Sequence, residues 1–176
     1  MITAVPILLN ILLHAPGEHC RSANYQGVNL MSRNQQIIAG CLGGVALSLL
    51  LVGVVSGTFI RHVIQILPVA FALITVKRQS TWGTYAALPI FIFWLFIMTL
   101  IWLFLLDIAR FVTGRFTVVE VILTIFIGLS GIWGIVAVIR YRPKAHLVTG
   151  VLIFVLFAAL QIIAMWLSFK RPFANR

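Results

Sequence analysis

The sequence predicts an all-α fold: a polytopic bundle of transmembrane helices with four uninterrupted spans and a fifth over residues 58–76. Composition is the first observation, because 62% of the 176 residues are apolar and 9% are charged. A soluble domain has about 45–50% apolar and about 25% charged residues. The second observation is that the apolar residues form runs of the roughly 20 residues that cross a bilayer core. Third, these runs lack the alternation of a transmembrane β-barrel, so they must be helices that pair their own backbone groups in lipid.

Residues 1–30 differ in character from the rest of the chain. Residues 1–13 are apolar but have no basic region before them, which a secretory signal peptide would need. Residues 14–29 are polar and rich in turn formers, without helical periodicity. The polar stretch that begins at Met31 is typical of the short leader of a small polytopic protein. We therefore expect residues 1–30 to be poorly ordered and Met31 to be the true or an alternative start.

The remaining residues, 31–176, are expected to form a single transmembrane bundle. Its helices are predicted near residues 37–57, 58–76, 83–112, 117–140 and 143–169. One helix start has a clear signal: Thr117-Val-Val-Glu120 fits a capping box, in which the first and last side chains bond each other's backbone N–H groups. Gly114 is suited to end the helix before it.

Other side chains are expected to mark helix ends or kinks. Asp107 and Arg110 lie three residues apart and can pair on the last turn of their helix. Pro143 falls where a first-turn proline is tolerated. By contrast, Pro68 and Pro89 lie inside predicted helices. Each proline should kink its helix or mark a later helix start.

Residues 58–76 allow two interpretations. Counted from Thr58, the segment is long enough to span, provided that Arg61 and His62 reach the headgroups from its first turn. Alternatively, it is a re-entrant or interfacial helix broken at Pro68. The preceding Ser-Gly-Thr sequence suits a tight turn in which Thr58 caps the new helix.

The basic residues predict how the chain sits in its membrane. The chain has 13 Lys and Arg against 3 Asp and Glu, and the cations fall at the ends of apolar runs, where they anchor helices to anionic headgroups. The lipid bilayer is therefore the expected partner, and nucleic acid is not. With the start of the first span inside a bacterial cytoplasmic (inner) membrane, the cytoplasmic loops hold Lys77, Arg78, Arg140, Arg142 and Lys144. The two sides carry nearly equal numbers of cations, so the positive-inside rule favours this orientation only slightly.

Small residues recur on two predicted helices at spacings that let helix backbones approach in lipid. They are Gly40, Gly44, Ser48, Gly53 and Gly57 on the first, and Thr124, Gly128, Gly131 and Gly134 on the fourth. We expect these faces to pack within the chain, because a chain with several spans must first pack against itself. Association with itself or with other membrane proteins is the alternative.

One polar cluster is a candidate ligand site: Arg61, His62 and Gln65, together with Gln161 on the last span. Polar side chains within membrane spans often mark substrate or ion paths, and this cluster is suited to an anionic headgroup or a quinone-like ligand. The simpler interpretation is that the first three form a polar helix end. On that interpretation, Gln161 makes an interhelical hydrogen bond.

No residue pattern indicates an enzyme, a cofactor or a metal. Two of the four histidines, His14 and His19, precede the bundle, whereas His62 and His146 lie at helix starts. Haem ligation in a bundle needs histidines that face inward from within the spans. Nucleotide-binding loops, nucleophile elbows and zinc-protease motifs do not occur in the sequence.

These features predict a small integral membrane protein that acts through helix–helix and lipid contacts, as an accessory, assembly or structural component. The alternative is a small transporter or channel subunit with a polar path near Arg61, His62, Gln65 and Gln161. The arrangement of these four side chains discriminates between the two. Convergence on one hydrated cavity favours transport, whereas separate contacts with headgroups or single partners disfavour it.

Overall fold

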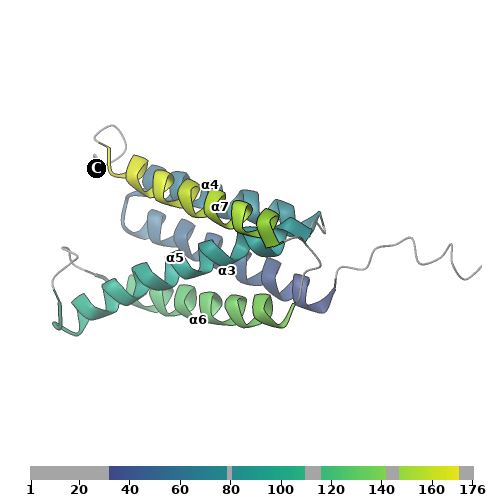
Figure 1. Ribbon diagram of the computed structural model, residues 1–176. Coiled ribbons are helices and arrows are strands. Elements are labelled where there is room, and N and C mark those ends of the chain that lie inside the picture. Colours follow the sequence, from purple (N-terminus) through teal and green to yellow (C-terminus); the bar gives the residue numbers. More distant parts are fainter. Residues whose placement is uncertain (1–31, 79–80, 110–115, 142–146, 171–176) are drawn as a thin grey trace, which may run out of the picture. The chain divides into compact units, whose positions relative to one another are not determined.

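The computed structural model describes residues 32–78, 81–109, 116–141 and 147–170. Within these ranges the chain forms helices and no strands (Figure 1). The helices are α3 (Arg33–Val55), α4 (Phe59–Lys77), α5 (Thr81–Leu105), α6 (Val118–Arg140) and α7 (Leu147–Ser168). All five are long and apolar enough to cross a membrane. The predicted fold class is therefore confirmed, and the helices fit an integral membrane protein.

Several predictions from the sequence lie outside the described residues. They are the poorly ordered stretch 1–30, the start at Met31, the stop at Gly114, the Asp107–Arg110 pair, and the roles of Pro143, His14, His19 and His146.

Helix α3 begins at Arg33, earlier than the predicted start near residue 37. The reason is a capping box that the sequence analysis overlooked. The Ser32 hydroxyl oxygen accepts a hydrogen bond from the Gln35 backbone N–H at 3.3 Å, and the Gln35 side-chain oxygen accepts one from the Ser32 N–H at 3.2 Å. These bonds satisfy backbone donors that would otherwise lack partners at a helix start.

Helix α4 confirms that residues 58–76 can span, and it is not broken at Pro68, which lies buried inside the continuous helix. The turn before it forms as predicted, with Gly57 in the left-handed conformation at φ +67°. The predicted cap at Thr58 needs correction. Thr58 occupies the cap position, but its side chain makes no capping hydrogen bond and lies beside His62 instead.

Helix α5 continues through Pro89 and ends at Leu105, earlier than the predicted end near residue 112. Two hydrogen bonds close the helix: Ile108 N–H to Leu103 C=O and Asp107 N–H to Phe104 C=O, each at 3.0 Å. Asp107 has a left-handed backbone, φ 56°. This is the Schellman arrangement, which glycine usually provides.

The predicted capping box at the start of α6 is confirmed. The Thr117 side chain accepts from the Glu120 backbone N–H at 3.3 Å. In return, Glu120 Oε2 accepts from the Thr117 N–H at 2.7 Å and from its hydroxyl at 2.9 Å. The N–H groups of Thr117 and Glu120, which have no partner within the helix, are therefore satisfied at the start of α6.

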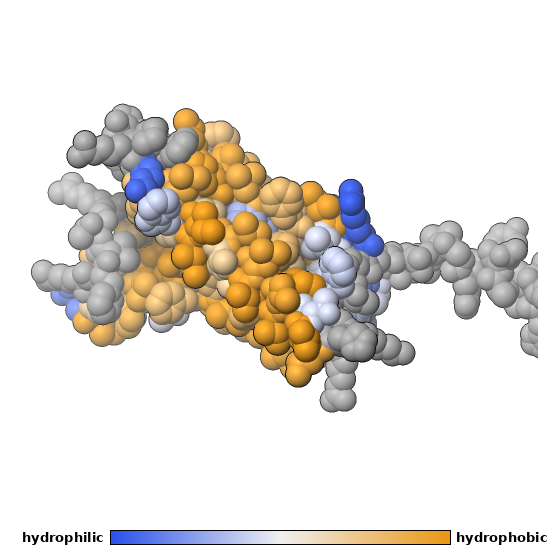
Figure 2. All heavy atoms as spheres, turned by 45° about the horizontal axis from the view of Figure 1, so that its top comes forward, coloured by the Kyte–Doolittle hydropathy of each residue, from blue (hydrophilic) through white to orange (hydrophobic). Residues whose placement is uncertain are grey.

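Helix α5 is the element that contacts the other four described helices. Helix α3 packs mainly on α4 and α6, and α4 also packs on α7, whereas α6 makes no contact with α7 or α4 in the described chain. The face shown in Figure 2 is hydrophobic over its middle, with hydrophilic residues toward its two ends. That distribution suits helices surrounded by lipid.

Some of the glycines predicted to pack do lie against a neighbouring helix. A Cβ at Gly134 would lie 2.4 Å from the Phe91 ring, one at Gly131 2.9 Å from Leu95, and one at Gly44 3.1 Å from Ser130. A Cβ at Gly53 would lie 2.8 Å from His62, in the next helix.

Other predicted packing positions differ. Described atoms leave open space at Gly40, Gly57 and Gly128, while Ser48 and Thr124 are buried. Close approaches at Gly83, to the backbone of Val76, and at Gly150, to Tyr85, were not predicted.

Candidate functional site

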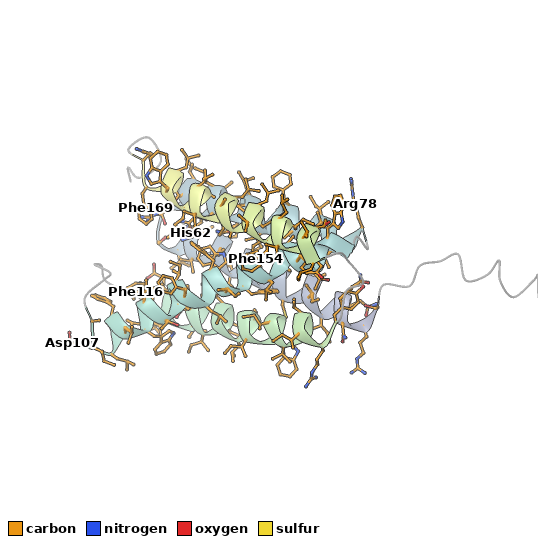
Figure 3. The ribbon with its side chains drawn as sticks, viewed as in Figure 1. His62, Arg78, Asp107, Phe116, Phe154 and Phe169 are labelled. Atoms are coloured by element: carbon orange, nitrogen blue, oxygen red, sulfur yellow. The ribbon has the colours of Figure 1, made fainter. Side chains whose placement is uncertain are left out.

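A cavity of about 350 Å³ lies at the end of the bundle where α4 and α6 begin and α3, α5 and α7 end. We call it the end cavity. All five described helices contribute to its wall, and its polar lining consists of Ser56, Thr58, Arg61, His62, Gln65, Glu120 and Thr124. Figure 3 shows His62, Phe116 and Phe169 toward this end, with Arg78 at the other.

The hairpin between α3 and α4 positions His62. Gly53 leaves room for the imidazole, since a Cβ there would come within 2.8 Å of the His62 Cβ. His62 Nδ1 lies 3.0 Å from the Thr58 carbonyl oxygen and 3.1 Å from the Thr58 hydroxyl. A carbonyl only accepts hydrogen bonds, so the contact with the Thr58 carbonyl favours the neutral tautomer that has its proton on Nδ1 and its acceptor at Nε2.

Arg61 lies over the ring of Phe169, the residue that follows α7. Its guanidinium carbon is 3.8 Å from the centre of the Phe169 ring, a cation–π contact that orients the side chain. Among the described residues, Arg61 forms no ion pair with a carboxylate. The cation therefore keeps hydrogen-bonding capacity toward the end cavity, because a guanidinium has five N–H donors.

Gln65 and Gln161 connect α4 to α7 below the two first-turn residues. The Gln65 amide nitrogen donates to the Ser168 hydroxyl at 2.9 Å and to Met165 Sδ at 3.2 Å. Gln161 donates to the Gln65 backbone carbonyl at 3.4 Å, which is the interhelical hydrogen bond that the sequence predicts. Gln161 does not line the end cavity, and its fully buried Oε1 has no partner among the described residues.

Glu120 and Thr124 line the end cavity from α6. They lie one helical turn apart and therefore on the same face. Glu120 is 8% exposed, and both of its side-chain hydrogen bonds with described residues end on Oε2. The sequence analysis gave Glu120 only the capping role, although the four-residue spacing to Thr124 was a signal of a shared polar face.

Trp94 is a further lining residue that the sequence analysis did not select. It is 2% exposed, lines the end cavity from α5, and its indole N–H has no partner among the described residues. Leaving a buried donor unpaired costs about 1–3 kcal/mol. The N–H itself is closed off even from a water-sized molecule, so it is a buried unpaired donor behind the cavity wall and not a contact point for a ligand.

The opposite half of the bundle is closed by close packing. Fully buried side chains from α3, α4 and α5 fill it, among them Ile38, Leu42, Val69, Ala72, Ile90 and Phe91. The end cavity is thus a dead end in the described structure. Its polar groups lie near one membrane face, and the apolar core lies beyond them.

Three of the four predicted site residues, Arg61, His62 and Gln65, come together in the end cavity, and Gln161 is linked to Gln65 behind its wall. Among the described residues, no group of three His, Cys, Asp or Glu side chains is placed to hold a metal ion. Cys41 is a half-buried free thiol, and Cys20 lies outside the described ranges.

Comparisons with known proteins give no assignment: no family model, no curated protein and no solved structure matches the chain.

Proposed function

We propose that this protein is a non-catalytic integral membrane protein that binds an amphipathic molecule of the bilayer in its end cavity. The observation that carries the proposal is the lining of that cavity: polar side chains from α4 and α6 face apolar side chains from α5 across about 350 Å³. This volume is within the usual range of ligand sites, about 300–1,000 Å³. A molecule with both polar and apolar parts matches such a wall.

The charged groups in the lining support a bound ligand rather than an empty packing defect. Empty cavities in proteins are apolar, whereas the wall of this cavity contains a half-buried cation, Arg61, and a buried carboxylate, Glu120. The polar part of an amphipathic ligand would supply partners to these groups.

The proposal that the protein is not an enzyme is supported by the pairing of its most suggestive side chains. Thr58 and His62 resemble a nucleophile beside a base, since their side chains lie 3.1 Å apart. However, the same Nδ1 atom lies 3.0 Å from the Thr58 carbonyl oxygen, which only accepts hydrogen bonds. In the tautomer that uses this contact, Nδ1 carries a proton and cannot accept the one from the Thr58 hydroxyl.

We further propose that the protein is an accessory component of a larger assembly in a bacterial cytoplasmic membrane, with the start of α3 on the cytoplasmic side. Helix α3 begins with Arg33, α4 ends at Lys77 and Arg78, and α6 ends at Arg140, so these cations share one end of the bundle. Described cations at the other end, Arg61 and Lys170, lie over aromatic rings. Cationic loop ends of this kind favour the cytoplasmic side.

Ligand binding is tested by filling the cavity. Val52 lines it from α3, whereas Val54 on the same helix is 60% exposed on the outside of the bundle. We expect the native protein, purified in mild detergent, to retain a small amphipathic molecule that mass spectrometry detects. Val52→Phe should remove it, and Val54→Phe should leave it in place. Equal retention in both variants would contradict the proposal.

Mild purification also tests the accessory role, because a partner protein should co-purify in fixed stoichiometry. A chain that purifies alone, as a monomer or an oligomer of itself, would contradict that part of the proposal.

Transport is the second candidate, since Arg61, His62 and Gln65 converge on one cavity. A transporter must also open this site to the opposite face, through the closely packed layer that includes Leu42 and Ile90. Alternating access requires two packings of that layer. Accumulation of the retained molecule inside proteoliposomes that contain the purified protein would favour transport over simple binding.

A further inference from the structure

Two charged side chains of opposite sign line the end cavity from different helices. Arg61 is the third residue of α4 and Glu120 is the third residue of α6, and both helices begin at this end. Their charges therefore lie in the first helical turn, at the depth of lipid headgroups. Helices α4 and α6 make no contact in the described chain, and no ion pair joins the two side chains. The cavity thus separates a cation from an anion.

Both charged groups have unused bonding capacity. The interaction that the described residues offer Arg61 is the ring of Phe169, which leaves its N–H donors without an acceptor. Both side-chain hydrogen bonds of Glu120 end on Oε2, which leaves Oε1 without a described donor. A ligand with one acidic and one basic group would satisfy both sides at once.

Building on the proposed function, we infer that the ligand is a zwitterionic phospholipid with a phosphoethanolamine head group. Its phosphate binds the Arg61 guanidinium, which matches phosphate geometry, and its ammonium group donates to Glu120. A purely anionic head group would place negative charge beside Glu120 without a partner for it. A quaternary ammonium head group carries no N–H and cannot donate to the carboxylate.

The order of groups along the cavity wall agrees with the order of groups in a phospholipid. Below the two charges lie Gln65 and Thr124, each one turn further into its helix, and apolar side chains of α5 complete the wall. In a diacyl phospholipid the apolar acyl chains likewise follow the charged head group. The volume of about 350 Å³ holds a head group rather than a whole lipid, so the acyl chains extend into the bilayer.

The experiment reconstitutes the full-length protein with an equimolar mixture of phosphatidylethanolamine, phosphatidylglycerol and phosphatidylcholine. Native mass spectrometry then identifies the lipid that remains bound. We expect phosphatidylethanolamine to be enriched roughly tenfold over the other two, which is the effect of one charge-assisted hydrogen bond. A soluble head-group analogue, glycerophosphoethanolamine, should not displace it at an equal concentration, because the acyl chains anchor the lipid.

Charge-changing variants test the two ends of the head group separately. Glu120→Gln keeps the capping box, since glutamine serves at this position of the box, but it removes the negative charge. We expect the enrichment of phosphatidylethanolamine over phosphatidylglycerol to fall about tenfold in this variant. Arg61→Gln should reduce retention of every phospholipid, and Arg33→Gln, an exposed cation at the other end, should change nothing.

The outcomes separate this inference from the proposed function. Should Val52→Phe remove the bound lipid while the three phospholipids compete equally, the cavity binds lipid and the head-group assignment is wrong. A preference for phosphatidylglycerol in the native protein would also overturn the assignment. If no lipid is sensitive to Val52→Phe, the proposed function itself fails.

Discussion

Asp107 shows how one residue ends a membrane-spanning helix. Its backbone is left-handed at φ 56°, and the N–H groups of residues 107 and 108 bond back to the carbonyls of Phe104 and Leu103. An L-residue in this conformation costs roughly 1–2 kcal/mol, and Asp and Asn tolerate it better than others. The aspartate thus substitutes for the glycine that usually occupies this position.

The left-handed backbone predicts losses of different size for two substitutions at Asp107. Asp107→Ala should lower the free energy of unfolding by about 1 kcal/mol, because alanine pays the full cost of the left-handed backbone. Asp107→Gly should lower it by less, since glycine adopts this conformation freely. Reversible denaturation in mixed micelles would measure both values. Equal losses would show that a side-chain interaction of Asp107, and not its backbone, ends the helix.

At the scale of elements, the contact between α5 and α6 depends on the absence of side chains on α6. Gly134 lies against the Phe91 ring, where a Cβ would come within 2.4 Å, and Phe91 is fully buried. Without a hydrophobic driving force between helices in lipid, this close packing is the main source of attraction between them. One methyl group at Gly134 should therefore separate the two helices.

Gly134→Ala and Gly128→Ala form a matched pair on one helix. The first should destabilise the protein by about 1–3 kcal/mol, the usual cost of overpacking a filled core. The second faces open space and should be neutral or stabilise by about 0.5–1 kcal/mol, the helical preference for alanine over glycine. Thermal unfolding in detergent measures both. A loss at Gly128 as large as that at Gly134 would point to an intermolecular contact of this face.

The existence of the five helices could be predicted because an apolar segment without alternation can pair its backbone N–H and C=O groups in lipid only as a helix. The helix boundaries were harder to predict. The box at Ser32 and Gln35 is visible in the sequence, since a serine followed three residues later by glutamine is a start signal. The end of α5 is not visible in the sequence, because no local sequence pattern distinguishes an aspartate with a left-handed backbone from one inside a helix.

At the scale of the whole molecule, the end cavity depends on how helices distant in sequence are rotated toward one another. Arg61, His62 and Gln65 are neighbours on α4, so their proximity could be predicted from the sequence. Glu120 and Trp94 face them from α6 and α5, and no spacing along the chain connects them. Trp94 is one of several aromatic residues in its span, and only packing distinguishes a buried indole from a lipid-facing one.

The whole-molecule property that remains to be tested is the orientation of the bundle. Three exposed cations mark the ends of the bundle: Arg33 begins α3, Arg78 follows α4, and Lys170 lies after the end of α7. We replace each singly by cysteine in a chain that carries Cys20→Ser and Cys41→Ser. A membrane-impermeant thiol reagent is then applied to intact cells.

With five spans and the start of α3 inside, we expect Lys170→Cys to react and Arg33→Cys and Arg78→Cys to stay unlabelled until the cells are opened. In the reversed orientation, Arg33→Cys and Arg78→Cys would react in intact cells and Lys170→Cys would stay unlabelled. If α4 lay in the interface without crossing, Arg78→Cys alone would react, because residues 33 and 78 share a side only when both α3 and α4 cross. The expected pattern places the end cavity, with Arg61 and Glu120, at the outer face of the membrane. A lipid bound there would then enter from the outer leaflet.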